Sequence, residues 1–314
     1  HIARAMTFEE VYTTLNPNQQ KAVDTTEGSV MVVAGPGTGK TQVLGARVAS
    51  IVKNTDTSPE NILCLTFTEA ATTALRMRLN QFMGSQSYKV NVYTYHGFCN
   101  TVIQENKDLF GIQDLDPVSE LEVLEVMKEI VDELPNNSKI KRYVGDVYYD
   151  IKNLLKLFGL MKKDHLTAAN IHFKVIAKLE DMLTDESYLY QRKSGENQKG
   201  DINLRKYNAD KESLEKLVEA ALLLDSYDSK LAARKRYDFN DMITWVISAL
   251  KDNDDLLLKY QETYQYFLVD EYQDTNGAQN ELLYTLINYW ENPNVFVVGD
   301  DDQSVYKFQG ANVE

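Results

Sequence analysis

Four short runs of β-forming residues constrain the fold of this chain more than any other feature of its sequence. The runs are apolar on both of the faces that alternate along a strand, and they occupy residues 29–34, 61–67, 266–270 and 294–299. That pattern is typical of parallel strands covered by helices on both sides. Helical patterns follow at 40–52 and 70–82, so the sequence predicts an α/β fold with a doubly wound parallel sheet.

The pattern of the chain changes between about residues 114 and 234. Apolar residues such as Leu121, Leu124 and Val131 recur there at helical spacing, with acidic residues between them. We therefore expect an inserted all-helical domain at 114–234, with the α/β core built from residues 1–113 and 235–314. Within the insert, residues 191–211 carry little apolar content and are predicted to form a loop.

Composition narrows the class of protein. A chain of 314 residues can form two domains, and its 43% hydrophobic and 25% charged residues are typical of a soluble globular protein. No apolar run approaches the length that spans a bilayer, so we expect no membrane role. Cys64 and Cys99 lie far apart without a CxxC pair, which predicts neither a disulfide framework nor a zinc site and favours the cytoplasm.

A glycine-rich segment follows the first apolar run directly and opens a helical pattern. Its sequence is AGPGTGKT at residues 34–41. Glycines let the backbone N–H groups turn toward phosphate oxygens, and the helix N-terminus adds partial positive charge. The segment therefore predicts a phosphate-binding loop, in which Lys40 reaches the outer phosphates and the Thr41 hydroxyl binds Mg²⁺. The nucleotide-binding residues we expect here are Gly35, Gly37, Thr38, Gly39, Lys40 and Thr41.

Two acidic residues end the third apolar run, within the sequence FLVDEYQD at 267–274. The carboxyl end of a buried parallel strand lies at the edge where open α/β sheets bind ligands. We expect Asp270 to hold Mg²⁺ and Glu271 to polarise the water that attacks the terminal phosphate. After the fourth run, Gln303 is an uncharged hydrogen-bonding residue suited to sensing that phosphate.

The order of these elements resembles the ordered motifs of the UvrD/Rep-like superfamily 1 DNA helicases. The matching segments are LNPNQ at 15–19, AGPGTGKT at 34–41, TFT at 66–68, Tyr95-His96, VDEYQDT at 269–275 and GDDDQSVY at 299–306. The segment YDFNDM at 237–242 also resembles the place where that family's chain leaves its inserted helical domain. The resemblance extends from Leu15 to Glu314 and implies a P-loop, RecA-like motor core.

The resemblance implies an enzyme that uses ATP and Mg²⁺ to move 3′ to 5′ along single-stranded DNA and unwind duplex. By position, Gln19 would read the adenine edge, and DNA contacts would come from Phe67, His96, Tyr306 and Phe308. Implied partners are single-stranded DNA, junctions of single and double strands, and repair or recombination proteins in a bacterial nucleoid. We expect the second motor domain to be absent from these residues, which alone would be nearly inactive.

Several features leave other functions open. The net charge of −14 argues against a nucleic-acid partner, although a local groove can hold a strand by stacking and backbone N–H groups. Gln42, Lys307 and Gln309 stand at positions where the family often has arginine. Glu69-Ala70 stands where Asn-Lys is usual, and Phe308 replaces a common tryptophan. The alternatives are the motor part of a helicase-nuclease and an ATP-gated DNA-binding scaffold. Residues 191–211 are either a solvated loop or an arm that contacts DNA.

Overall fold

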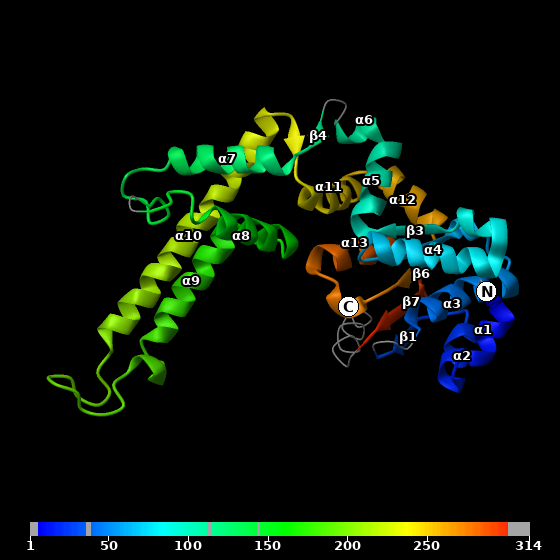
Figure 1. Ribbon diagram of the computed structural model, residues 1–314, viewed down its shortest axis with the longest axis horizontal. Helices are drawn as coiled ribbons and strands as arrows, with labels where there is room; N and C mark the ends of the chain where they lie inside the picture. The colour runs from blue at the N-terminus through cyan, green and yellow to red at the C-terminus, as the bar shows by residue number, and fades with distance from the viewer. Residues whose placement is uncertain (1–5, 36–38, 112–114, 143–144, 301–314) are drawn as a thin grey trace, which may run out of the picture. The chain divides into compact units, whose positions relative to one another are not determined.

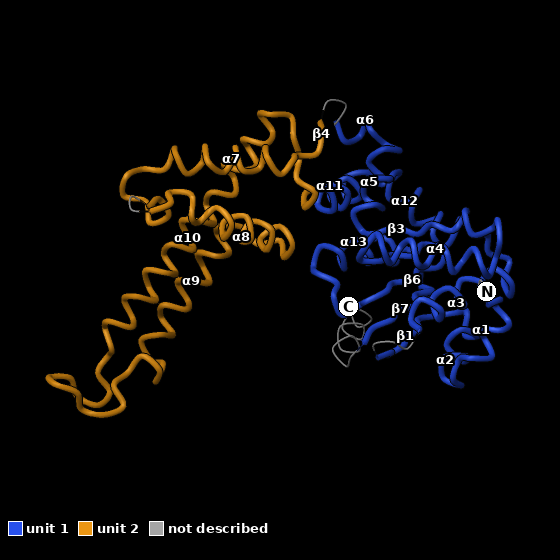
Figure 2. The backbone as a smooth tube through the Cα atoms, in the orientation of Figure 1, with its two compact units in different colours: residues 1–112, 242–314 blue, residues 113–241 orange. Residues whose placement is uncertain are grey.

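The computed structural model describes residues 6–35, 39–111, 115–142 and 145–300. The chain forms two compact units, coloured separately in Figure 2. Residues 1–112 and 242–314 make the first unit, and the intervening residues 113–241 make the second. Among the described helices, none is long and apolar enough to cross a membrane.

A five-stranded parallel sheet forms the centre of the first unit (Figure 1). Its strands, in spatial order, are β1 (Val30–Val33), β7 (Asn294–Gly299), β6 (Tyr266–Val269), β2 (Ile62–Thr66) and β3 (Asn91–Thr94). Neighbouring strands pair in parallel throughout, which confirms the predicted α/β class. The four apolar runs are all strands. The prediction missed β3, an edge strand that alternates between half-buried and buried residues instead of being apolar throughout.

Helices cover both faces of this sheet. Alternate strand residues such as Cys64, Leu268 and Val298 join one apolar core with helices α3 (Lys40–Asn54) and α4 (Glu69–Met83). On α3 pack the two short N-terminal helices, α1 (Phe8–Thr14) and α2 (Pro17–Asp24). The other helices of this unit are α5 (Tyr95–Glu105), α6 (Lys107–Phe110), α12 (Asp254–Thr263), α13 (Gly277–Ile287) and most of α11 (Phe239–Asp252).

Aromatic side chains pack against the opposite face of the sheet. The Phe98 ring of α5 lies 5.9 Å from the ring of Tyr264, which lies 6.4 Å from the ring of Phe267 on β6. Both Phe267 and its strand neighbour Val269 are buried. Strands buried on both faces are apolar at nearly every position, which explains the continuous apolar runs of the three central strands, β2, β6 and β7.

The second unit is helical, as the sequence predicted. Its helices are α7 (Glu120–Asp132), α8 (Ile151–Lys163), α9 (Ala168–Met182) and α10 (Leu204–Ala233), and a pair of two-residue strands, β4 (Asp116–Pro117) and β5 (Arg236–Tyr237), joins its two ends. One apolar core lies among α7, α8 and α10, and a smaller one lies where α9 meets α8 and α10.

The loop predicted at 191–211 is shorter than expected, because helix α10 begins at Leu204. Tertiary contacts hold the first turns of helix α10. The Tyr188 hydroxyl donates to Asp210 at 2.6 Å, and the Lys206 ammonium lies 4.5 Å from the Tyr188 ring centre. The polar composition of 204–211 therefore reflects an exposed helix surface rather than a loop.

A buried lysine joins three carboxylates inside the helical unit. The Lys162 ammonium of α8 lies 2.7 Å from Asp228, 2.7 Å from Asp241 and 4.0 Å from Asp238. Only 8% of the Lys162 side chain is exposed. These ion pairs tie α8 and α10 to the segment that follows β5.

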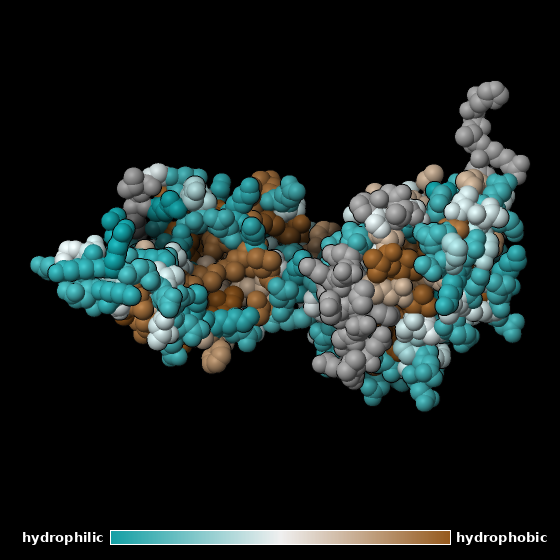
Figure 3. All heavy atoms as spheres, turned by 90° about the horizontal axis from the view of Figure 1, so that it is seen from below, coloured by the Kyte–Doolittle hydropathy of each residue, from teal (hydrophilic) through white to brown (hydrophobic). Residues whose placement is uncertain are grey.

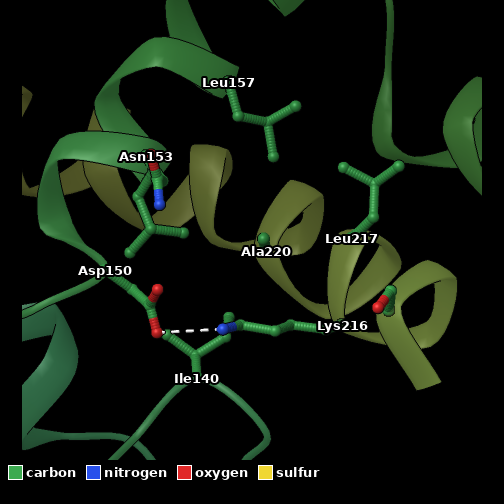
Figure 4. Close-up of a pocket in the computed structure, with 9 residues that line it drawn as sticks. Ile140, Asp150, Asn153, Leu157, Lys216, Leu217 and Ala220 are labelled. Atoms are coloured by element: carbon green, nitrogen blue, oxygen red, sulfur yellow. Dashed lines mark hydrogen bonds and ion pairs between the residues drawn. The ribbon is translucent and has the colours of Figure 1, made fainter. Parts of the chain in front are cut away.

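The helical unit also has a small pocket between α8 and α10, with a volume of about 210 Å³ (Figure 4). Apolar side chains line most of it, and an ion pair between Asp150 and Lys216, 3.0 Å apart, lies at one side. Figure 3 shows that this unit exposes apolar surface on one face, framed by hydrophilic residues.

Candidate active site

The glycine-rich segment lies where β1 passes into α3. The Ala34 N–H donates to the Gly299 carbonyl at 2.8 Å, which extends the pairing of β1 with β7. Gly39 precedes the helix with φ +73°, a left-handed conformation that favours glycine, and a Cβ atom there would lie 3.1 Å from Gln42 Oε1. Gly39 brings no capping side chain, so the first N–H groups of α3 have no side-chain cap. Gly35 lies just after β1, whereas Gly37 and Thr38 lie outside the described residues.

Lys40 opens helix α3 and points to the acidic residues after β6. Its ammonium lies 3.3 Å from both carboxylate oxygens of Glu271 and 3.9 Å from Asp300 Oδ2. The Lys40 side chain is only 14% exposed. The structure thus brings the expected phosphate-binding lysine and the expected catalytic acid into direct contact.

Asp270 is buried at the carboxyl end of β6. Its N–H donates to the Leu65 carbonyl of β2, and its Oδ1 accepts the Glu271 N–H at 2.8 Å. Burial raises the pKa of Asp270 to about 6, the Glu271 charge adds to the rise, and the Glu271 N–H and Lys40 oppose it. A cation bound beside Asp270 would offset this destabilisation of the charged carboxylate.

The donor set near Asp270 fits Mg²⁺. Hard divalent cations prefer carboxylate, hydroxyl and phosphate oxygens, and Mg²⁺ commonly takes only one or two protein ligands beside the phosphates. Asp270 supplies a carboxylate, and Thr41 supplies a hydroxyl from the first turn of α3. Glu271 and Asp300 form ion pairs with Lys40, and Asp270 interacts with the same lysine electrostatically, so the local excess of negative charge also favours a cation.

Glu271 has an unusual backbone conformation, with φ +48° and ψ +47°. For a residue other than glycine this left-handed conformation costs about 1–2 kcal/mol, and such residues are concentrated at functional sites. The Asp274 N–H donates to the Glu271 carbonyl at 2.9 Å and closes the short helical turn η4 (Tyr272–Asp274). The tight turn directs the Glu271 carboxylate back toward Lys40.

Gln19 lies in the first turn of α2, where it takes part in a capping box. Its side-chain oxygen accepts the Asn16 N–H at 3.0 Å, and its own N–H donates to Asn16 Oδ1 at 2.8 Å. In this structure Gln19 therefore stabilises the start of α2. Its expected contact with adenine stays a prediction.

Phe67 and His96 come together at the carboxyl ends of two paired strands. Phe67 follows β2, His96 follows β3, and the register pairs Thr66 with Thr94. The Phe67 ring packs on the buried Tyr95 ring at 5.6 Å and stays half-exposed. Gln303, Tyr306 and Phe308 lie outside the described residues, as do positions 307 and 309.

Glu69, one of the residues that differ from those common in the family, places a carboxylate at this same edge. The Thr94 hydroxyl donates to Glu69 Oε1 at 3.4 Å, so the carboxylate lies near the start of α5. Glu69 is exposed in the first turn of α4, where a negative charge is favourable to the helix. The acid therefore has a structural role at the start of α4, and it adds a negative charge to this edge.

Comparison with known families agrees with the motif order. Residues 15–314 match the sequence model of the UvrD/REP helicase N-terminal domain. The chain belongs to this family. Its relatives include the ATP-dependent DNA helicase PcrA of Staphylococcus aureus strain Mu50, 28% identical over 306 residues, and that of Staphylococcus epidermidis strain RP62A, 29% identical over 306 residues. Each match covers 96% of this chain and 35% of the relative, so the chain spans about a third of the length of these relatives.

Two residues of this UvrD/REP helicase N-terminal domain were missed by the sequence analysis. Arg47 is buried in α3, and its Nη1 donates to the carbonyls of Ala22, Val23 and Thr25, which fixes the end of α2 against α3. The signal was one arginine in an otherwise apolar helical run. Gln273 donates from Nε2 to Glu271 Oε2 at 2.5 Å. The signal in the sequence was its place between the acidic residues of DEYQD.

Proposed function

We propose that this domain is the ATP-binding motor core of a DNA helicase that moves 3′ to 5′ along single-stranded DNA. The observation that supports the proposal most directly is the contact of Lys40 with Glu271, 3.3 Å apart at the carboxyl edge of the sheet. A phosphate-binding lysine and a strand-end acid that face each other are what phosphoryl transfer to water needs.

The chain's own residues divide the chemical roles. The backbone from Gly35 to Gly39 would cradle the phosphates of ATP, and Lys40 would leave Glu271 to contact the outer phosphates. Thr41 and Asp270 would hold Mg²⁺, which when bound supplies positive charge against the phosphate oxygens. Glu271 would orient the attacking water and accept its proton. Gln303 would sense the terminal phosphate, and Gln19 would contact the adenine edge.

Single-stranded DNA would bind along the edge that carries Phe67 and His96. Base stacking on Phe67 tolerates any sequence, as a motor on DNA requires. Support comes from the half-exposed position of the Phe67 ring against Tyr95 and from the pairing of β2 with β3, which brings His96 to the same edge. Tyr306 and Phe308 would add further stacking positions.

We assign the motor role to the α/β core and treat the residues from about 114 to 234 as an insertion in it. Helicase activity would belong to the whole protein, because the relatives named above are about three times as long as the matched segment. In the whole protein, a second motor domain would supply the other wall of the nucleotide site.

The test measures ATP hydrolysis and unwinding by the whole protein. We expect single-stranded DNA to stimulate ATP hydrolysis, and a duplex with a 3′ single-stranded tail to be unwound in preference to one with a 5′ tail. The Glu271→Gln protein serves as the control and should bind DNA without unwinding it. ATP hydrolysis that single-stranded DNA does not stimulate, or unwinding only from a 5′ tail, would overturn the proposal.

A further inference from the structure

The Glu271 carboxylate has two neighbours that hold it, and one of them is expected to leave. Lys40 contacts both Glu271 oxygens at 3.3 Å, but Lys40 is also the residue expected to bind the outer phosphates. When it does so, Glu271 loses a partner at the moment when its orientation matters. The other neighbour is Gln273, whose amide Nε2 donates to Glu271 Oε2 at 2.5 Å.

The Gln273 side-chain amide donates a hydrogen bond from its nitrogen and accepts one at its oxygen. While the nitrogen donates to Glu271, the Oε1 oxygen accepts the backbone N–H of Asp300 at 3.3 Å. Asp300 directly follows β7, and Val269 of β6 is in register with Val297 of β7. The glutamine therefore spans the ends of two neighbouring strands, from the expected catalytic acid to the start of the segment that carries Gln303.

The chemistry of an amide suits this position. Glu271 and Asp300 already form ion pairs with Lys40, so a further acidic side chain would repel Glu271 and a further basic side chain would compete with Lys40 for it. An amide adds no charge, yet it offers a donor and an acceptor on one planar group. A hydrogen bond to an ionised carboxylate is stronger than one between neutral groups.

We propose that Gln273 is the positioning residue for Glu271, which keeps the carboxylate oriented for the attacking water once Lys40 has moved to the phosphates. The proposal rests on the proposed function, because it assumes that Glu271 is the catalytic base. Through its hydrogen bond to the Asp300 N–H, Gln273 also couples the orientation of Glu271 to the position of Asp300.

The experiment uses the whole protein with saturating single-stranded DNA and compares Gln273→Met and Gln273→Glu with the natural sequence. Methionine matches the length of glutamine and removes both hydrogen bonds, whereas glutamate keeps the acceptor and places a second charge beside Glu271. We expect kcat for ATP to fall about tenfold to a hundredfold in Gln273→Met, the loss of one hydrogen bond to a charged group. The fall in Gln273→Glu should be larger. The Kd for a non-hydrolysable ATP analogue should stay within about twofold.

Gln279→Met is the matched control. Gln279 is another glutamine in the same part of the chain, but it caps helix α13 through the Asn276 N–H at 3.2 Å. We expect this variant to lower Tm and leave kcat unchanged. If both Gln273 variants keep the natural kcat, or if Gln273→Met changes kcat, Kd and Tm together, Gln273 has no positioning role.

The Glu271→Gln protein separates this inference from the proposed function. If Glu271→Gln hydrolyses ATP at the natural rate, the proposed function is wrong and Gln273 has no base to position. If Glu271→Gln is inactive while the Gln273 variants are fully active, only the inference about Gln273 is wrong.

Discussion

The ammonium of Lys40 lies 3.3 Å from both carboxylate oxygens of Glu271, although the two residues are 231 positions apart in the chain. The contact crosses from β1 to β6 over the end of β7, because the strand order is β1-β7-β6. The pair therefore lies at the carboxyl edge of the sheet, where open α/β sheets bind ligands.

Lys40→Ala and Glu271→Gln should therefore have different effects. Removing the lysine takes away the charge that binds the outer phosphates, so ATP binding should weaken strongly. Removing the acid leaves the phosphate contacts in place, so binding should persist while turnover falls about 10²- to 10⁴-fold. Calorimetry of ATP binding and single-turnover hydrolysis measure the two effects. Equal loss of binding in both variants would contradict this division of roles.

Phe67→Ala should lower the affinity of the whole protein for single-stranded DNA by about 1–3 kcal/mol, with little dependence on base sequence. The ring is half-exposed although it lies 5.6 Å from the Tyr95 ring, so a base could stack on its exposed part. Fluorescence anisotropy with labelled oligonucleotides measures the affinity. Phe173→Ala removes a 76% exposed ring from the helical unit and should change nothing. Unchanged DNA affinity with a large drop in Tm for Phe67→Ala would show that its ring is a core residue.

Lys162→Met should destabilise the helical unit by about 3 kcal/mol, since it leaves Asp228, Asp238 and Asp241 near one another without their shared cation. The loss of stability should be at the low end of the range for broken buried ion pairs, because water still reaches part of each of the three acids. Lys163→Met, at the exposed next position, should stay within about 0.5 kcal/mol of the natural protein. Urea unfolding followed by circular dichroism compares them, and equal stability of the two variants would show that the ion-pair cluster contributes nothing.

Glu122→Gln should lower Tm at pH 7, and the difference should shrink in acid. The pKa of Glu122 is held below its usual value by the Ser119 backbone N–H and hydroxyl and by Arg236, whose Nε lies 2.9 Å from Glu122 Oε1. A lowered pKa in the folded state means that the stabilisation is present above the ordinary pKa of 4.5 and disappears as the pH falls through the folded value. Thermal unfolding from pH 7 to pH 3 measures this. A Tm difference that does not depend on pH would show that charge plays no part.

Much of the candidate site could be predicted because its physical causes are local. A glycine-rich segment between an apolar strand and a helix presents N–H groups wherever it occurs, and Gly39 has the left-handed conformation that such a turn requires. The four apolar runs could be read as strands because parallel strands covered on both faces, as β2, β6 and β7 are, carry apolar residues at nearly every position.

Contacts between distant parts of the chain were decided only by the tertiary structure. Strand β3 escaped prediction because half-buried and buried residues alternate along it, and contacts of Tyr188 with Lys206 and Asp210 hold the polar first turns of α10. Sequence alone identified Lys40 and Glu271 as separate candidates, but their contact, and the bridge from Gln273 to Asp300, depend on which strands are neighbours. Strand order is set by how the connecting helices pack on both faces of the sheet, and that packing is a property of the whole unit rather than of any short segment.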